Sequence, residues 1–144
     1  MAVVGPGEGG DLAAAEEVGR LLGQRGATLV CGGLGGVMEA ACRGAKETGG
    51  STVGILPGDH RAAANEFVDV AIATGLGEGR NLLVVRSAEA VIAIGGAYGT
   101  LSEIALALRA GKRVVGLDTW DIDGVERADS PEAAVETVLS DLST

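Results

Sequence analysis

The segment AVIAIGGAYGTLSE, residues 90–103, has residue types and a spacing that suit the binding of an anion. It begins as an apolar run, breaks at Gly95 and Gly96, and continues after Gly99 with helical spacing from Thr100 onward. A strand, a glycine turn and a helix start in this order present backbone N–H groups that have no partner within the helix. Glycines also allow the backbone to approach a phosphate closely. The segment therefore predicts a phosphate site.

A purely structural role is also open for part of this segment. Thr100 and Glu103 have the spacing of a capping box, in which the glutamate only satisfies a backbone N–H at the helix start. Three glycines before such a cap are more than capping requires, however. Because capping and ligand binding can share residues, both roles stay open at this point.

Two further glycine-rich loops follow apolar runs. Residues 5–10, GPGEGG, match the dinucleotide pattern G-x-G-x-x-G, but Glu8 would place a carboxylate beside a pyrophosphate. We interpret this loop as a strand-to-helix turn that faces the ligand cleft, and not as an NAD site. Residues 32–36, GGLGG, either pack a strand tightly against a helix or form the floor of the phosphate pocket through Gly33.

The elements that position these loops alternate along the chain. The expected strands cover residues 1–4, 27–31, 51–56, 67–73, 90–94 and 112–117. The expected helices cover residues 12–25, 37–48, 80–87, 101–110 and a last helix capped by Ser130. Residues 59–66 and 118–129 are expected to be irregular.

Apolar strands that alternate with helices predict a parallel sheet covered on both faces. With right-handed crossovers, the expected fold is a single-domain, Rossmann-like, doubly wound α/β sheet over residues 1–144. In such sheets ligands bind outside the carboxyl ends of the strands. The glycine loops at residues 5–10, 32–36, 75–79 and 95–99 should therefore gather along that edge.

The charge and composition exclude several classes of partner. A net charge of −9 argues against a nucleic-acid groove, which needs clustered Lys and Arg. Only Phe67, Tyr98 and Trp120 are aromatic, which argues against a platform for stacked bases of a nucleic acid. An acidic protein can still bind one phosphate through backbone amides, because such a site is local.

The remaining composition points to a reduced, cytoplasmic protein with no membrane partner. Cys31 and Cys42 do not form a metal-ligand pattern, and we expect them to be reduced and buried as small apolar residues. No run reaches membrane-spanning length and no signal peptide is visible. The chain begins inside an apolar run, so Met1 need not be the true start.

The sequence G-G-x-x-G-T-x-x-E, residues 95–103 after an apolar strand, resembles the signature of the LOG family, whose characterised members are nucleoside 5′-monophosphate phosphoribohydrolases. Residues 32–40, GGLGGVMEA, and residues 53–57, VGILP, are similar to two other segments of that family. The resemblance thus extends over most of the chain. It implies a homodimer or higher homo-oligomer and a small phosphorylated ligand, and we expect no metal or cofactor.

The resemblance also implies roles for individual residues. Glu103 would contact the ribose and help to position water, and Arg80 matches the arginine of the family's catalytic arginine–lysine pair. Such a carboxylate can stabilise an oxocarbenium-like centre while the arginine neutralises negative charge. The 5′-phosphate would be held by Gly95, Gly96, Gly99 and Thr100.

Two departures from the family pattern bear on activity. Asn81 stands where the family has the lysine, and Ile94 stands where its signature has proline. The Arg80-Asn81 pair and the run G-G-x-Y-G-T-L-S-E-I-A resemble the short subgroup that includes the molybdenum cofactor carrier protein, which binds a pterin phosphate without transforming it. Two functions therefore stay open. One is a carrier or sensor with Asn81 in the ligand site, and the other is a phosphoribohydrolase that uses Arg80 and Glu103.

Overall fold

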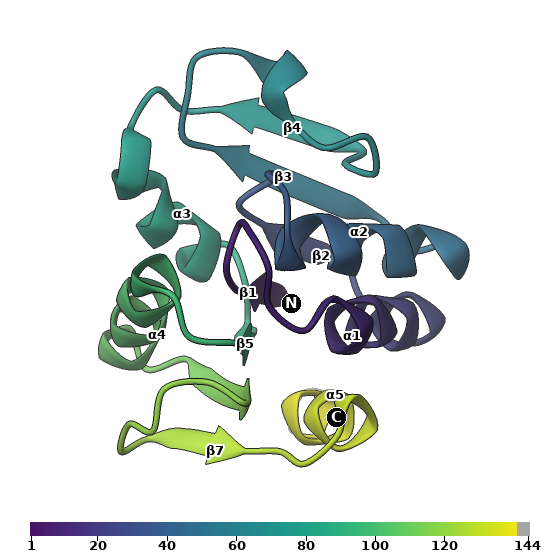
Figure 1. Cartoon of the computed structure of the whole chain (residues 1–144), viewed down its shortest axis with the longest axis vertical. Helices are drawn as coiled ribbons and strands as arrows, with labels where there is room; N and C mark the ends of the chain where they lie inside the picture. The colour runs from purple at the N-terminus through teal and green to yellow at the C-terminus, as the bar shows by residue number, and fades with distance from the viewer. Residues whose placement is uncertain (141–144) are drawn as a thin grey trace.

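A computed structural model of the chain describes residues 1–140 and contains one seven-stranded sheet (Figure 1). The strands are β1 (Ala2–Val4), β2 (Leu29–Cys31), β3 (Thr52–Leu56), β4 (Val70–Ala73), β5 (Ala90–Ile94), β6 (Arg113–Leu117) and β7 (Val125–Arg127). They lie in the order β4-β3-β2-β1-β5-β6-β7, and every neighbouring pair is parallel. The order reverses between β1 and β5, which is the switch point of a doubly wound sheet.

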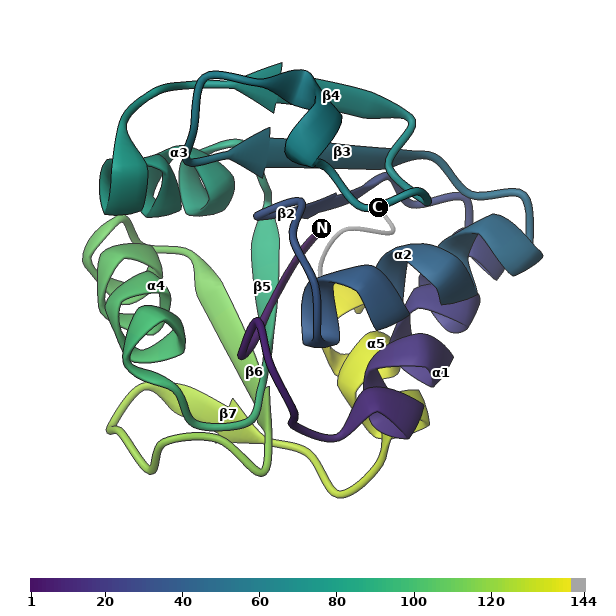
Figure 2. The ribbon, with the colours of Figure 1, turned by 45° about the horizontal axis from the view of Figure 1, so that its top comes forward.

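Helices cover both faces of this sheet. They are α1 (Leu12–Gln24), α2 (Val37–Glu47), α3 (Arg80–Arg86), α4 (Tyr98–Arg109) and α5 (Pro131–Leu139), with short 3₁₀ helices at Arg61–Ala63 and Gly77–Gly79. Figures 1 and 2 show α1, α2 and α5 on one face and α3 and α4 on the other. The predicted Rossmann-like α/β fold is therefore confirmed.

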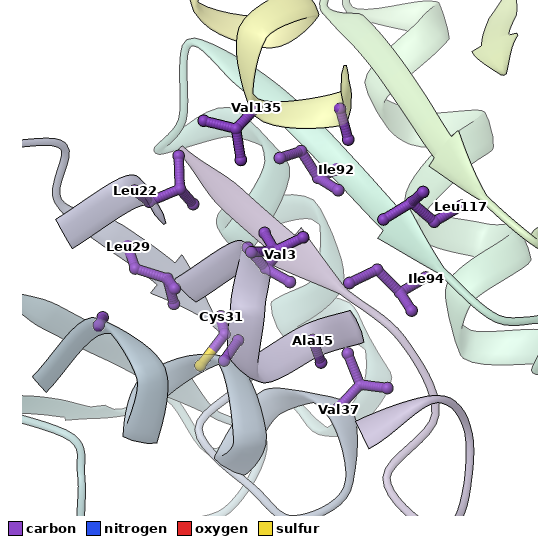
Figure 3. Close-up of a cluster of buried hydrophobic side chains, with 14 of the residues drawn as sticks. Val3, Ala15, Leu22, Leu29, Cys31, Val37, Ile92, Ile94, Leu117 and Val135 are labelled. Atoms are coloured by element: carbon purple, nitrogen blue, oxygen red, sulfur yellow. The ribbon is translucent and has the colours of Figure 1, made fainter. Parts of the chain in front are cut away.

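The core has two parts, one on each side of the sheet. The larger part packs strand residues such as Val3 and Ile92 against Leu22 of α1 and Val135 of α5 (Figure 3). The smaller part lies under α3 and α4. Each fully buried aliphatic side chain contributes about 1.5–3 kcal/mol relative to its exposed state.

Both cysteines lie in the larger part of the core, as expected. Cys31 ends β2 and Cys42 lies within α2, and neither side chain is exposed. Their Sγ atoms are 3.5 Å apart, and both thiols are free. The hydrogen bond to Cys42 is the main cause that lowers the pKa of Cys31, whereas the same bond and burial raise the pKa of Cys42.

Helices α1 and α2 touch at the level of their backbones. A Cβ atom at Gly19 would stand 1.9 Å from the carbonyl oxygen of Ala41, and one at Gly44 would stand 1.9 Å from that of Glu16. Only glycine fits at both positions, because any side chain would overlap the backbone of the facing helix. The two helices therefore form one tightly packed layer behind the glycine loops.

Two segments differ from the sequence-based expectation. The strand expected at residues 67–73 begins only at Val70, because side chains take up the backbone groups before it: Thr52 Oγ1 donates to the Phe67 oxygen at 2.6 Å and Asn65 Oδ1 accepts from the Phe67 N–H at 3.0 Å. The segment expected to be irregular at 118–129 contains β7, whose three residues are too few to show a period. No helix within residues 1–140 is long and apolar enough to cross a membrane.

Candidate functional site

Three glycine-rich loops meet where β1, β2 and β5 end. The Val37 N–H donates to the Pro6 oxygen at 3.0 Å, which ties the loop of residues 5–10 to the start of α2. A Cβ atom at Gly36 would stand 2.3 Å from that same oxygen, and one at Gly95 would stand 3.1 Å from Pro6 Cδ. The predicted gathering of glycine loops at this edge of the sheet is confirmed for these three loops.

Residues 95–100, named here the phosphate loop, carry free backbone donors. The loop is fixed at Gly95, whose N–H donates to the Leu117 oxygen at 3.2 Å and whose oxygen accepts from Thr119 Oγ1 at 2.6 Å. After it, α4 begins at Tyr98 with Ala97 as a cap that has no side-chain hydrogen bond. Within the described part of the chain, the N–H groups of residues 96–100 donate to no protein acceptor. The helix dipole adds a partial positive charge there.

Thr100 adds an unsatisfied hydroxyl to this cluster of donors. Its side chain is 1% exposed, and its Oγ1 atom has no hydrogen-bond partner within residues 1–140. A buried hydroxyl without a partner costs about 1–3 kcal/mol, so its presence needs an explanation. The capping box predicted for Thr100 and Glu103 does not explain this hydroxyl and is wrong, because α4 begins two residues before Thr100 and no side chain caps the helix.

Glu103 lies one turn further along α4 and is also buried. Its side chain is 6% exposed and receives no hydrogen bond from residues 1–140. Burial raises the pKa of Glu103 to about 7, and the nearby charge of Arg80 opposes that rise. A carboxyl group with this pKa can exchange a proton near neutral pH.

Arg80 is held in place at the start of α3. Its Nε donates to the Ile55 oxygen at 3.0 Å, and its Nη1 donates to Asn81 Oδ1. A Cβ atom at Gly32 would stand 2.7 Å from Arg80 Nη2, so the guanidinium lies directly over the end of β2. The arginine predicted as a site residue is therefore a fixed cation beside Glu103 and not a free surface side chain.

Asn81 connects this arginine to the phosphate loop. Its side chain is 4% exposed, and its Nδ2 donates to Ser102 Oγ at 3.0 Å. Ser102 Oγ in turn donates to the Gly99 oxygen at 2.8 Å. The amide of Asn81 is thus engaged within the protein on both sides, and its contact with a ligand stays a prediction.

Gly33 has a clear packing role. Its φ is +78°, and a Cβ atom there would stand 2.7 Å from a methyl of Leu56. Its N–H donates to Cys31 Sγ at 3.3 Å, and its oxygen accepts from the Asn65 N–H at 2.9 Å. These contacts account for the glycine without a ligand, so the pocket-floor role also stays a prediction.

The structure adds residues that sequence reasoning missed. Ser102 completes the chain from Arg80 to Gly99, and Trp120 Nε1 donates to the Ala97 oxygen at 3.0 Å. The aromatic ring directly after β6 was the one available signal for Trp120. No three His, Cys, Asp or Glu side chains within residues 1–140 group as metal ligands.

Comparisons with known proteins agree with this arrangement. The model of the SLOG cluster4 family matches residues 1–141. The chain belongs to the SLOG cluster4 family. The predicted resemblance to LOG-like proteins is thereby confirmed. A similar protein of this length, an uncharacterized protein of Archaeoglobus fulgidus, is 47% identical over 127 residues, which are 88% of this chain and 83% of that protein.

Solved structures resemble this SLOG cluster4 protein along its whole length. The molybdenum cofactor binding protein of Rippkaea orientalis is 40% identical with a TM-score of 0.93, and the match covers 99% of this chain and 96% of that one. The molybdenum cofactor carrier protein of Chlamydomonas reinhardtii is 35% identical with a TM-score of 0.88, covering 99% and 97%. DNA processing protein A of Helicobacter pylori, 19% identical with a TM-score of 0.73 and covering 97% and 80%, shares the fold alone.

Proposed function

We propose that this protein binds a phosphorylated nucleotide or nucleotide-like ligand, such as a pterin phosphate, at the phosphate loop and acts as a carrier or sensor. The observation that carries the proposal is the set of free donors at the start of α4. It consists of the N–H groups of residues 96–100 together with the orphaned hydroxyl of Thr100. Such a cluster suits a phosphate group, because several backbone N–H groups and a hydroxyl can donate hydrogen bonds to one anion.

The local field favours an anion in spite of the acidic chain. The net charge is −9, but surface charges beyond a Debye length of about 8–10 Å are screened in physiological salt. The N-terminal end of α4 and the fixed guanidinium of Arg80 act at close range. A single phosphate therefore meets a locally positive site.

The similar proteins support the choice of ligand class. Those from Rippkaea orientalis and Chlamydomonas reinhardtii are described as molybdenum cofactor binding and carrier proteins, and each matches nearly the whole of this chain. A phosphorylated pterin is therefore the first nucleotide-like ligand to test.

We further propose a homodimer that works in the cytoplasm. The apolar side chains of Leu82 and Leu83, 39% and 38% exposed on α3, support a protein–protein contact.

A second function, a nucleoside 5′-monophosphate phosphoribohydrolase, is favoured by one observation. Glu103 is a buried carboxyl group whose pKa of about 7 places it near its protonation midpoint at neutral pH. In this reaction water replaces the base at the sugar carbon. The ionised Glu103 would stabilise the positive sugar centre and accept a proton from that water, while the base leaves with the electrons of the broken bond and takes up a proton from solvent. Arg80 would neutralise charge on the phosphate end.

The experiment that separates the two functions follows the fate of AMP. The purified protein is incubated with AMP and related nucleoside monophosphates, and free base is measured by chromatography while binding is measured by calorimetry. Binding without base release supports a carrier or sensor. Base release that is lost in Glu103→Gln and in Arg80→Ala supports the hydrolase. If neither AMP nor a pterin phosphate binds, the phosphate site itself is wrong.

A further inference from the structure

Two of the three aromatic residues of the chain lie together at the phosphate loop. The rings of Tyr98 and Trp120 are stacked, with centroids 6.2 Å apart and planes inclined by 25°. Trp120 is anchored, because its Nε1 donates to the Ala97 oxygen at 3.0 Å and its ring packs on the core under α4. Tyr98 rests on it and is 84% exposed. A rigid indole thus supports a tyrosine ring that is open to solvent.

This aromatic pair is continuous with the free donors of the loop. Tyr98 is itself the first residue of α4, and its backbone N–H is one of the free donors. The hydrogen bond of Trp120 Nε1 to the Ala97 oxygen places the loop backbone in contact with the indole, and a Cβ atom at Gly96 would stand 3.8 Å from the same nitrogen. A ligand group bound to the loop therefore lies beside the rings.

A hollow lies beside Trp120, next to β6 and β7. It has a volume of about 380 Å³, and its lining includes Thr119, Trp120, the cation Arg127 and the carboxylates Asp118 and Asp129. Thr119 also binds the loop, through its hydroxyl bond to the Gly95 oxygen at 2.6 Å. The hollow and the phosphate loop thus share a wall, and a molecule with a phosphate at one end can extend from the loop into the hollow.

We infer that Tyr98 and Trp120 form the binding surface for a planar ring of the ligand, whose phosphate lies on the N–H groups of residues 96–100. This inference rests on the proposed function and assigns the surface on which the flat heterocycle of that ligand lies. Stacking on an aromatic side chain suits any such ring, because every heterocycle has a π face. Tyr98 supplies the open face, and Trp120 fixes its position.

The test compares two probes that share a phosphate and differ in the ring. Affinities for AMP and for ribose 5-phosphate are measured by calorimetry with the wild-type protein, Tyr98→Ala and Tyr98→Phe. We expect Tyr98→Ala to lower the affinity for AMP by about tenfold and to leave the affinity for ribose 5-phosphate unchanged. Tyr98→Phe should keep the wild-type affinity for AMP. Because Trp120 is the only tryptophan, its emission should change with AMP and not with ribose 5-phosphate.

The outcomes separate this inference from the proposed function. If both probes bind equally well and Tyr98→Ala affects neither, the phosphate site stands and the ring surface is wrong. If Tyr98→Ala weakens both probes alike, the tyrosine only shapes the loop, and the inference is also overturned. If neither probe binds the wild-type protein, the proposed function fails and the ring surface fails with it. The exposed position of Tyr98 leaves folding intact in both variants.

Discussion

The side chains of Asn81 and Ser102 meet at 3.0 Å, and this hydrogen bond joins α3 to α4 directly beside the phosphate loop. Asn81 also accepts from Arg80, and Ser102 also donates to the Gly99 oxygen. A cation on one helix is thus connected to the backbone of the loop on the next. The arrangement couples the position of Arg80 to the shape of the loop.

This chain of bonds predicts that Asn81 and Ser102 are energetically dependent. Asn81→Ala removes a buried amide together with its hydrogen bonds to Arg80 and Ser102, so it should lower the free energy of unfolding by about 1–3 kcal/mol. Ser102→Ala leaves the buried Nδ2 of Asn81 without its acceptor and should have a cost in the same range. Urea denaturation of both single variants and the double variant measures the dependence. A sum of single effects that equals the double effect would show that the two residues act separately.

Thr100→Val should separate binding from stability. The change keeps the shape of the side chain and removes a buried hydroxyl that has no partner, so the ligand-free protein should gain about 1 kcal/mol. The same change removes a hydrogen-bond donor to the phosphate and should lower the affinity for AMP by about tenfold. Calorimetry and thermal unfolding give both quantities, with Thr100→Ser as the control that keeps the hydroxyl. A loss of stability in Thr100→Val would show that the hydroxyl of Thr100 does have a hydrogen-bond partner in the ligand-free protein.

The raised pKa of Glu103 predicts a dependence of stability on pH. Because its pKa rises from 4.5 to about 7 on folding, the folded state binds more protons than the unfolded state between these values. This group's contribution to stability is therefore complete below about pH 4.5 and is lost as the pH rises through 7. Glu103→Gln should remove the loss and be more stable than the wild type by about 3 kcal/mol above pH 8.

The pH experiment needs a control for the simple loss of a negative charge. Glu8 is exposed, so Glu8→Gln removes a charge at the surface of the same acidic protein. Denaturation curves from pH 4 to pH 9 for the three proteins give the comparison. A constant difference between Glu103→Gln and the wild type at all values would mean that Glu103 does not titrate as burial requires.

Gly99→Ala tests the close approach of a phosphate to the loop. A Cβ atom at Gly99 would meet no atom within 4 Å, so the ligand-free protein should fold as before and gain up to about 1 kcal/mol of helix stability. Because Gly99 itself carries one of the free N–H donors, the added methyl group should hinder the approach of a phosphate and lower the affinity for AMP by about tenfold or more. Gly58→Ala, where a Cβ atom also meets nothing within 4 Å, is the matched control. Unchanged affinity in Gly99→Ala would remove this glycine from the site.

The same chemical change should have the opposite result within the helix pair. Gly44→Ala would place a methyl group 1.9 Å from the Glu16 oxygen, so α1 and α2 must separate. We expect a loss of about 3 kcal/mol or more, at the upper end of what overpacking costs. Thermal unfolding beside Gly99→Ala gives the comparison. Equal stability of the two variants would contradict the backbone contact.

Sequence reasoning predicted the sheet because its central strands are continuous apolar runs. Residues 90–94 and 113–117 are buried on both faces, and such runs alternate clearly with helical patterns. It failed where tertiary contacts decide whether an element forms and at which residue it begins. The start of α4 at Tyr98 follows from the loop geometry at Gly95, and β7 forms only because β6 offers an edge to pair with.

Sequence reasoning could predict a candidate site but not the hydrogen bonds that connect its residues. The glycines and Thr100 indicate a helix start after a strand, and local rules predict a phosphate site there. The contacts of Asn81 with Ser102 and of Trp120 with Ala97 join residues about twenty positions apart, and no spacing pattern encodes them. Glu103 illustrates the same limit, since its burial and not its type sets its pKa.

The glycine contact between α1 and α2 also makes one helical layer of the molecule more rigid than the other. Gly19 and Gly44 lock these helices backbone to backbone, so the side that carries the loops of residues 5–10 and 32–36 can only move as a block. On the other side, α3 and α4 are joined beside the ligand site by the side-chain bond of Asn81 to Ser102. We therefore expect that any movement which admits a larger ligand to the candidate site occurs on that second side, while the first side keeps its conformation.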